Sequence, residues 1–374
     1  MDNIILDILE KTDKIYIFGA ASRAKTIKGY MNMLFPGLEI MGYLVDDEEK
    51  NDARIAGAPV IHLDRASKEE IENLWTKAPV VIATKGIFHQ RIENLLASLG
   101  FESVIPVSVD VDNCLRNAYV RKAFAKEGRE FVKLESLAKK AEGGSTDACI
   151  YMAKSIYDKE LETPYRIPRY EKPLQVGAAL TDKRLRAGIL TDDTGGNISA
   201  KNRQYCETTG MYWVWKNCRH DWVGFSHYRR HFVLPGAWAD IMKEHDIDAV
   251  VPVPTYLYPS VGENYKERHL PEDWEFLLKY LRENEAKAYD KAMKIFAGNL
   301  FLPGNMFIAK WEVFDKLCTF AFPILKAVGE NGGMKEDGYL NRYVAFISER
   351  LVTLFFALHE DEYKIVYADR IFLR

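Results

Sequence analysis

The chain has 374 residues, of which 48% are hydrophobic and 28% charged, and its formal net charge is −3. This length predicts two domains with sizeable cores, and the nearly balanced charge excludes non-specific binding to nucleic acid. The cysteines lack metal-type or disulfide-type spacing, the N-terminal residues lack the regions of a signal peptide, and the longest apolar run, 351–358, is too short to span a bilayer. We therefore expect a cytoplasmic protein with reduced thiols.

Short apolar runs alternate with helical patterns over the N-terminal part of the chain. Strands are predicted at 14–18, 40–45, 79–84 and 103–106, with helices between them. Because strand alternating with helix is typical of a parallel sheet covered on both faces, the sequence predicts an α/β fold that begins with a Rossmann-like domain over 1–142.

The turn after the first predicted strand could hold a nucleotide. A phosphate could be held by the free amides of the following helix, helped by Ser22 and Arg23, and Asp46 stands where a ribose-binding acid is found. The glycine motif is incomplete, since Gly19 is the single glycine of this turn. A structural, regulatory or dimerising role for this domain is the alternative interpretation.

A charged helix is predicted over 118–140, and the glycine-rich segment 142–146 ends it, so we place the domain boundary there. The second domain, 146–374, is also expected to be α/β. Its predicted elements are strands at 148–153, 173–180, 221–226, 247–253, 299–309 and 363–367, and helices over 202–217 and 336–359.

Three basic side chains and a tyrosine follow the predicted strand 221–226, namely His227, Tyr228, Arg229 and Arg230. Ligands of open α/β sheets bind at strand ends, and arginine presents a rigid fork of donors that suits phosphate oxygens. A diphosphate is the expected ligand. The alternative is a solvated strand end.

Several stretches of the second domain resemble a family of bacterial glycosyltransferases of capsular polysaccharide and lipopolysaccharide O-antigen synthesis, whose shared domain was long described only as one of unknown function. The resemblance covers roughly 148–374. It is carried by residues 175–179, 192–202, 205–207, 212–217, 224–230, 305–308 and 348–351.

This resemblance implies a GT-A-like catalytic domain that moves a hexose, with galactofuranose as one donor sugar to test, from a UDP-sugar to a glycan or lipid-linked oligosaccharide. The usual metal-binding Asp-x-Asp is replaced by His227-Tyr228-Arg229, so Mn²⁺ or Mg²⁺ is not expected to be essential. By analogy, Asp337, with Glu336 beside it, is the expected base of an inverting reaction. The residues expected to bind the donor are Asp192, Asp193, Asn197, His227, Tyr228, Arg229, Arg230 and Asn305.

Other interpretations stay open. Asp192 and Asp193 also suit a turn, and Glu336 and Asp337 also suit the start of a helix. A basic stretch between Arg166 and Arg186 is either a solvated loop or a peripheral contact with the inner face of the cell membrane. A protein that senses nucleotides through its N-terminal domain is the alternative to an enzyme.

Overall fold

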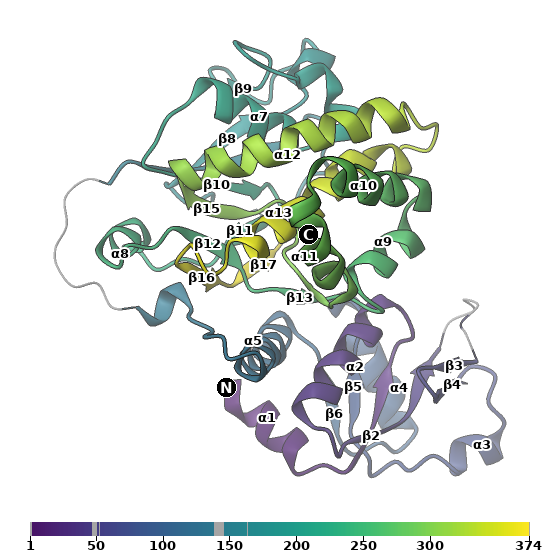
Figure 1. The fold of residues 1–374 in the computed structure, drawn as a ribbon. Helices are drawn as coiled ribbons and strands as arrows, with labels where there is room; N and C mark the ends of the chain where they lie inside the picture. Colours follow the sequence, from purple (N-terminus) through teal and green to yellow (C-terminus); the bar gives the residue numbers. More distant parts are fainter. Residues whose placement is uncertain (1, 47–50, 52, 138–145, 163, 374) are drawn as a thin grey trace. The chain divides into compact units, whose positions relative to one another are not determined.

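The computed structural model describes residues 2–46, 51, 53–137, 146–162 and 164–373, and the chain divides into two compact units, 1–130 and 131–374 (Figure 1). The expected boundary at 142–146 lies, apart from Thr146, outside the described residues. Residues 131–137 belong to the second unit, because Leu134 is fully buried in its core and the Val132 carbonyl accepts a hydrogen bond from the Tyr367 amide.

The first unit contains a six-stranded sheet in the order β3-β4-β2-β1-β5-β6, in which only the β3–β4 pair is antiparallel among the described strands. Its strands are β1 (Lys14–Phe18), β2 (Glu39–Val45), β3 (Arg54–Ile55), β4 (Ala58–His62), β5 (Val80–Ile82) and β6 (Val104–Pro106). Its helices are α1 (Asp2–Glu10), α2 (Ser22–Leu34), α3 (Lys68–Glu72), η1 (Gly86–Phe88), α4 (His89–Ser98) and α5 (Val109–Lys126).

Helices cover both faces of this sheet, as the strand–helix alternation predicts. Tyr16 and Phe18 of β1 pack with Ile92 of α4 on one face. On the other face α2 packs against α5, where the rings of Tyr30 and Tyr119 lie 5.2 Å apart. The parallel order and the covering helices confirm the Rossmann-like α/β architecture.

The helix predicted over 118–140 is wrong at both ends. It starts earlier, because the Ser108 hydroxyl accepts a 3.2 Å hydrogen bond from the Val111 amide and caps α5. It ends at Lys126, two residues before Gly128, whose φ of 71° no helix accommodates.

The second unit contains a nine-stranded mixed sheet whose main path is β16-β12-β15-β10-β7-β8-β9, with β11 paired to β10 and β17 paired to β11. Its strands are β7 (Ala148–Lys154), β8 (Glu171–Gln175), β9 (Leu190–Thr191), β10 (Trp222–His227), β11 (Arg230–Phe232), β12 (Ala249–Pro252), β15 (Phe307–Lys310), β16 (Ile365–Ala368) and β17 (Arg370–Phe372); β13 (Thr255–Tyr256) and β14 (Leu300–Phe301) pair separately.

The helices of this unit are α6 (Asn202–Tyr205), α7 (Thr208–Asn217), α8 (Trp238–Glu244), α9 (Val261–Arg268), α10 (Pro271–Asn284), α11 (Ala286–Ala297), α12 (Trp311–Gly332) and α13 (Tyr343–Leu358). Short 3₁₀ turns are η2 (Leu134–Ser136), η3 (Ala178–Leu180), η4 (Ser199–Lys201) and η5 (Leu340–Arg342).

Strand β10 lies in the middle of the second unit, with helices on both faces of its sheet (Figure 1). Its side chains alternate between the faces. Trp222 packs with Trp238 of α8 on one face, and the Phe225 ring lies 5.4 Å from the Phe314 ring of α12 on the other. His227 follows Phe225 by two residues and so extends from the α12 face.

Two predicted helices of this unit are corrected by the structure. The helix expected over 202–217 is interrupted at Cys206, whose φ of 46° and ψ of −129° separate α6 from α7. The helix expected from Glu336 begins at Tyr343, after the 3₁₀ turn η5. The 22-residue helix α12 was not predicted.

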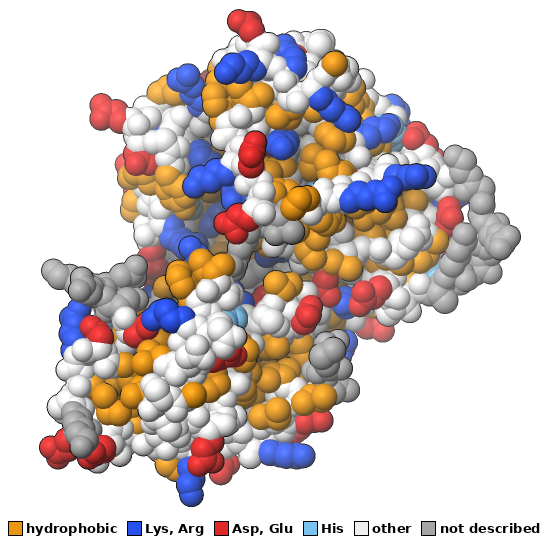
Figure 2. Space-filling view, turned by 180° about the vertical axis from the view of Figure 1, so that it is seen from behind, with side chains coloured by type: hydrophobic (Ala, Val, Ile, Leu, Met, Phe, Trp, Pro, Cys, Tyr) orange, Lys and Arg blue, Asp and Glu red, His pale blue; other side chains and the backbone are white. Residues whose placement is uncertain are grey.

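The surface carries both signs of charge. On the face drawn in Figure 2, basic, acidic and apolar side chains are interspersed over both units. This pattern agrees with the small net charge of −3.

Candidate functional site

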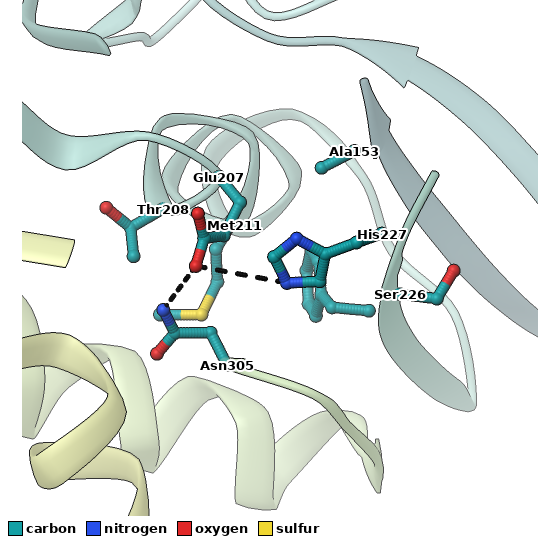
Figure 3. A pocket seen from close by; sticks show the side chains of 8 residues that line it. Ala153, Glu207, Thr208, Met211, Ser226, His227 and Asn305 are labelled. Atoms are coloured by element: carbon teal, nitrogen blue, oxygen red, sulfur yellow. Dashed lines mark hydrogen bonds and ion pairs between the residues drawn. The ribbon is translucent and has the colours of Figure 1, made fainter. Parts of the chain in front are cut away.

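A small cavity lies where β7 and β10 end side by side. The two strands are parallel, and Ala153 is paired with His227 in their register. The cavity has a volume of about 10 Å³, which is room for about one water molecule. Its lining residues are Ala153, Glu207, Thr208, Met211, Phe225, Ser226, His227 and Asn305. Figure 3 shows Glu207, His227 and Asn305 directed toward one another and the Ser226 side chain pointing away from them.

A tight hairpin between β10 and β11 presents the residues from His227 to Arg230, which pair at its base. The Ala153 carbonyl accepts a 3.1 Å hydrogen bond from the Tyr228 amide, and the Arg229 carbonyl accepts a 2.7 Å bond from the Leu373 amide. Beneath the hairpin, the fully buried His231 lies 2.8 Å from a carboxylate oxygen of Glu171. The hairpin is thus held from both sides.

His227 is held as a neutral ring. Its Nε2 lies 2.5 Å from the Gly304 carbonyl, which can only accept, so Nε2 carries the proton. Burial lowers the pKa of His227, and the charge of Arg230 lowers it further, against the opposing charge of Glu207. This corrects the expectation that His227 adds positive charge for a diphosphate.

Asn305 connects strand β15 to Glu207. Its Nδ2 donates a 2.8 Å hydrogen bond to Glu207 Oε1, and its Oδ1 accepts a 2.9 Å bond from the Ser348 hydroxyl. Gly304 and Asn305 both have left-handed backbone, with φ of 84° and 50°. The Gly304 amide donates a 2.7 Å bond to Glu349, so two neighbouring residues of α13 hold this turn in place.

Cys206 places Glu207 at the start of α7. Its positive φ of 46° is uncommon for a residue with a side chain, and strained backbone of this kind concentrates at functional sites. The Cys206 thiol accepts a 3.2 Å hydrogen bond from Arg342 Nε, and burial raises the pKa of this thiol to about 12. The thiol is therefore a packing and acceptor group rather than a nucleophile.

Four basic side chains gather around the hairpin. The guanidinium of Arg229 lies 5.1 Å from the Tyr228 ring centre and that of Arg230 lies 5.5 Å from the Phe372 ring centre. Lys154, at the end of β7, lies 5.8 Å from the Tyr228 ring, and the charge of Arg342 acts on Glu207 and His227. Within the part of the chain that the structure describes, none of these four cations forms an ion pair with a carboxylate.

The carboxylates of Asp158, Glu207 and Glu349 act on this basic cluster, which we define as Lys154, Arg229, Arg230 and Arg342. Asp158 accepts a 2.7 Å hydrogen bond from the Ser155 amide. Burial raises the pKa of Asp158, and the charges of Arg229, Lys154 and Arg342 act in the opposite direction. The cluster therefore carries a net positive charge that suits an anionic ligand.

Asp192, expected at the donor, has a structural role instead. It is fully buried, and its carboxylate accepts hydrogen bonds from the amides of Gly177 and Ala178 and from the hydroxyls of Ser199 and Thr209. Each oxygen is occupied by two protein donors, so no oxygen is left for a ligand or metal. The expectation that Asp192 contacts the donor is therefore corrected.

The neighbouring candidates lie in the same loop. Asp193 pairs with Arg184 at 2.8 Å. Asn197 is exposed and bridges the Gly195 carbonyl and the Ser199 amide, as a turn residue does. Neither residue lines the cavity.

Glu336 and Asp337 are exposed in the loop between α12 and η5. Asp337 Oδ1 accepts hydrogen bonds from the amides of Tyr339 (2.8 Å) and Leu340 (2.7 Å), so it caps η5. The same turn ends at Arg342 of the basic cluster.

Two of the four residues predicted to bind a nucleotide in the first unit form side-chain contacts with other residues of the chain. Gly19 has a φ of 111° at the end of β1, and Ser22 is exposed at the start of α2. Arg23 donates a 2.7 Å hydrogen bond to the Val107 carbonyl. The Asp46 carboxylate pairs with Arg91 instead of standing free.

Sequence reasoning missed Lys154, Asp158, Glu207 and Arg342. Of these, Glu207 stands in a stretch that carries the family resemblance, 205–207, and this was the available signal. Lys154 and Asp158 follow a predicted strand, where polar residues are common.

Among the described residues, no three His, Cys, Asp or Glu side chains are grouped so that they could hold a metal ion. None of the described helices combines the length and the apolar character needed to cross a bilayer.

Comparison with protein-family models matches residues 156–360 to a domain of unknown function, DUF4422. The match covers more than half of the chain, so the chain belongs to this family. Among solved structures, the apo form of the bifunctional glycosyltransferase WbbM is similar, with a TM-score of 0.52 and 24% identity over 61% of this chain. That similarity shows a shared fold, and this chain spans 45% of the length of WbbM. Comparison with curated proteins finds no match.

Proposed function

We propose that this protein is a glycosyltransferase that moves a hexose from a nucleotide sugar, UDP-linked in the first instance, to a hydroxyl of a glycan acceptor. The observation that carries the proposal is the basic cluster of Lys154, Arg229, Arg230 and Arg342, whose members have no carboxylate partner among the described residues. The cluster lies at the carboxyl ends of β7 and β10, where open sheets bind ligands. The fold shared with a glycosyltransferase agrees with this assignment.

In this proposal the cluster binds the diphosphate and stabilises the charge that builds on it as the bond to the sugar breaks. Preorganised cations are effective there because they need no rearrangement during the reaction. Tyr228 supports two of these cations with its ring face. Asp337 is proposed as the base that removes the proton from the hydroxyl group of the acceptor glycan. One of its oxygens is held by backbone amides and the carboxylate is exposed, so the second oxygen is available.

The acceptor is proposed to be a lipid-linked glycan of bacterial surface polysaccharide synthesis, met at the cytoplasmic face of the membrane. The family resemblance of the 224–230 and 348–351 stretches supports this step.

The test is a panel of nucleotide sugars, each incubated with the full chain and watched for release of the nucleoside diphosphate. Release from one member, with Arg229→Ala much slower, supports the proposal. Lack of release from every member, together with no measurable binding of UDP, UDP-sugars or other nucleoside diphosphates, contradicts it.

A further inference from the structure

Two hydrogen-bond acceptors at the cavity have no donor from the protein. His227 donates through Nε2 to the Gly304 carbonyl, and burial lowers the pKa of the ring, so in the neutral ring Nδ1 carries a lone pair. Nδ1 makes no hydrogen bond to a described residue. In Glu207, Oε1 accepts from Asn305, and Oε2 likewise meets no donor among the described residues. Both side chains are largely enclosed, with 13% of His227 and 15% of Glu207 exposed.

The orientation of both groups is set by the structure around them. A carboxylate can only accept, so the Asn305 amide must turn its Nδ2 toward Glu207 and its Oδ1 toward the Ser348 hydroxyl. Glu349 holds the Gly304 amide at 2.7 Å, which places the Gly304 carbonyl against His227. Helix α13 thus fixes the tautomer of the ring and the position of the carboxylate.

The chemistry of such a pair selects its ligand. Phosphate oxygens are acceptors and anions, so neither a lone pair nor a carboxylate recognises them. Hydroxyl groups are donors, and the cavity of about 10 Å³ accommodates a group of that size rather than a whole sugar ring. The remaining walls include Met211 and Phe225, which cannot replace the missing donors.

We propose that Glu207 and His227 form a hydroxyl-reading pair, which accepts hydrogen bonds from hydroxyl groups of the transferred hexose beside the diphosphate subsite. This inference rests on the proposed function and goes beyond it, because it separates the residues that read the sugar from those that hold the diphosphate. His227 moves from the second group to the first. Ser348 and Asn305 are positioning residues for Glu207.

The test uses binding of UDP alone, UDP-galactopyranose, UDP-galactofuranose and UDP-glucose to the full chain by calorimetry. Glu207→Gln replaces one acceptor oxygen by an amide donor of the same size. His227→Gln keeps a donor for the Gly304 carbonyl and removes Nδ1. The matched control is Glu312→Gln, because Glu312 is 72% exposed at the start of α12 and pairs only loosely, at 3.6 Å, with Arg219.

We expect wild type to bind one UDP-hexose roughly 10-fold or more tightly than UDP, since hydrogen bonds to charged groups contribute about that factor. Both site variants should keep the affinity for UDP within about 3-fold and lose the extra affinity for the sugar, whereas the control changes neither. A monodeoxy analogue of the preferred donor that lacks the contacted hydroxyl should bind wild type and Glu207→Gln alike.

Several outcomes would overturn the inference while leaving the proposed function in place. If the variants lose the same factor in affinity for UDP and for UDP-hexose, His227 and Glu207 contact the diphosphate or the ribose instead of the hexose. Wild type that binds UDP-hexose no better than UDP, or variants that retain the sugar's contribution, would also contradict it. Melting temperatures of the variants within a few degrees of wild type exclude misfolding as the cause. A chain that binds neither UDP nor any UDP-hexose would remove the proposed function and this inference together.

Discussion

The Thr209 hydroxyl donates a 2.6 Å hydrogen bond to the buried carboxylate of Asp192, 17 residues earlier in the chain. This contact joins the loop after β9 to the first turn of α7, the helix that begins beside Glu207. Asp192 also accepts hydrogen bonds from the amides of Gly177 and Ala178. Its carboxylate therefore connects three segments, namely the turn at Gly177 and Ala178, the loop after β9 and the first turn of α7.

Replacement of this carboxylate should destabilise the fold. Asp192→Ala leaves buried amide and hydroxyl donors without an acceptor, and each buried donor left unsatisfied costs about 1–3 kcal/mol. Urea unfolding measures the change. Asp193→Ala, which removes only the partly exposed pair with Arg184, is the control and should cost under about 1 kcal/mol. Equal and small effects of the two changes would show that Asp192 is not a structural anchor.

Arg229→Ala and Arg230→Ala should each weaken the binding of UDP. A charge-assisted hydrogen bond contributes about 1.5–3 kcal/mol, so the dissociation constant should rise roughly 10-fold to 100-fold. Calorimetry with UDP gives the constant, and thermal unfolding checks that the variants stay folded. Arg219→Ala is the control, because Arg219 is 71% exposed and outside the basic cluster. Unchanged UDP affinity in both cluster variants would refute a role in diphosphate binding.

Turnover should survive an excess of chelator. The basic cluster supplies the positive charge that a divalent ion held by carboxylates would otherwise bring, and Asp192 has no oxygen left for an ion. The measurement is release of nucleoside diphosphate with and without EDTA. Loss of turnover that Mn²⁺ or Mg²⁺ restores would contradict this expectation and direct attention to Asp158 and Glu207 as ligands.

Asp337→Asn should lower kcat at least ~10²-fold, which is the lower end of what a positioned base contributes. The asparagine oxygen can still accept from the amides of Tyr339 and Leu340, so η5 should keep its cap and the affinity for UDP should stay near wild type. Glu336→Gln is the internal comparison and should have a smaller effect. Transfer at nearly the wild-type rate, or a product that retains the anomeric configuration of the donor, would leave Asp337 with its capping role alone.

His269 should make stability depend on pH. Burial, with the nearby charges of Arg350, Arg268 and Arg342, lowers the pKa of His269 from 6.5 to about 3. Below pH 6.5 His269 binds a proton in the unfolded chain but stays unprotonated in the folded chain. The contribution of His269 to the free energy of unfolding is therefore fully present above pH 6.5 and is lost as the pH falls toward 3. Between pH 6.5 and 5 the loss should be about 2 kcal/mol, at 1.36 kcal/mol per pH unit.

The measurement is urea unfolding of wild type and His269→Gln across this range. The glutamine variant loses the ring stacking with Phe346, at 4.1 Å, and should start less stable, but its dependence on pH should be shallower. Identical slopes for the two proteins would show that another group controls the effect.

The local pattern of the sequence was enough to predict the α/β class, the strands of both sheets near 14–18, 148–153 and 221–226, and the basic residues from His227 to Arg230 after a strand. These features follow from apolar periodicity and from charge at a strand end, which are properties of neighbouring residues. The ends of helices were less predictable. The break at Cys206 depends on a strained backbone that no local preference favours.

Only the tertiary structure decided what each polar residue does. Glu207 and Asn305 are 98 residues apart and meet because β15 and the start of α7 converge at the cavity. Asp192 stands among turn residues in the sequence, yet the folded chain surrounds it with donors from four residues. His227 belongs to a basic motif, yet burial lowers the pKa of its ring, and the Gly304 carbonyl determines which ring nitrogen carries the proton. Partners and desolvation determine the role of a polar group, and both come from segments distant in sequence.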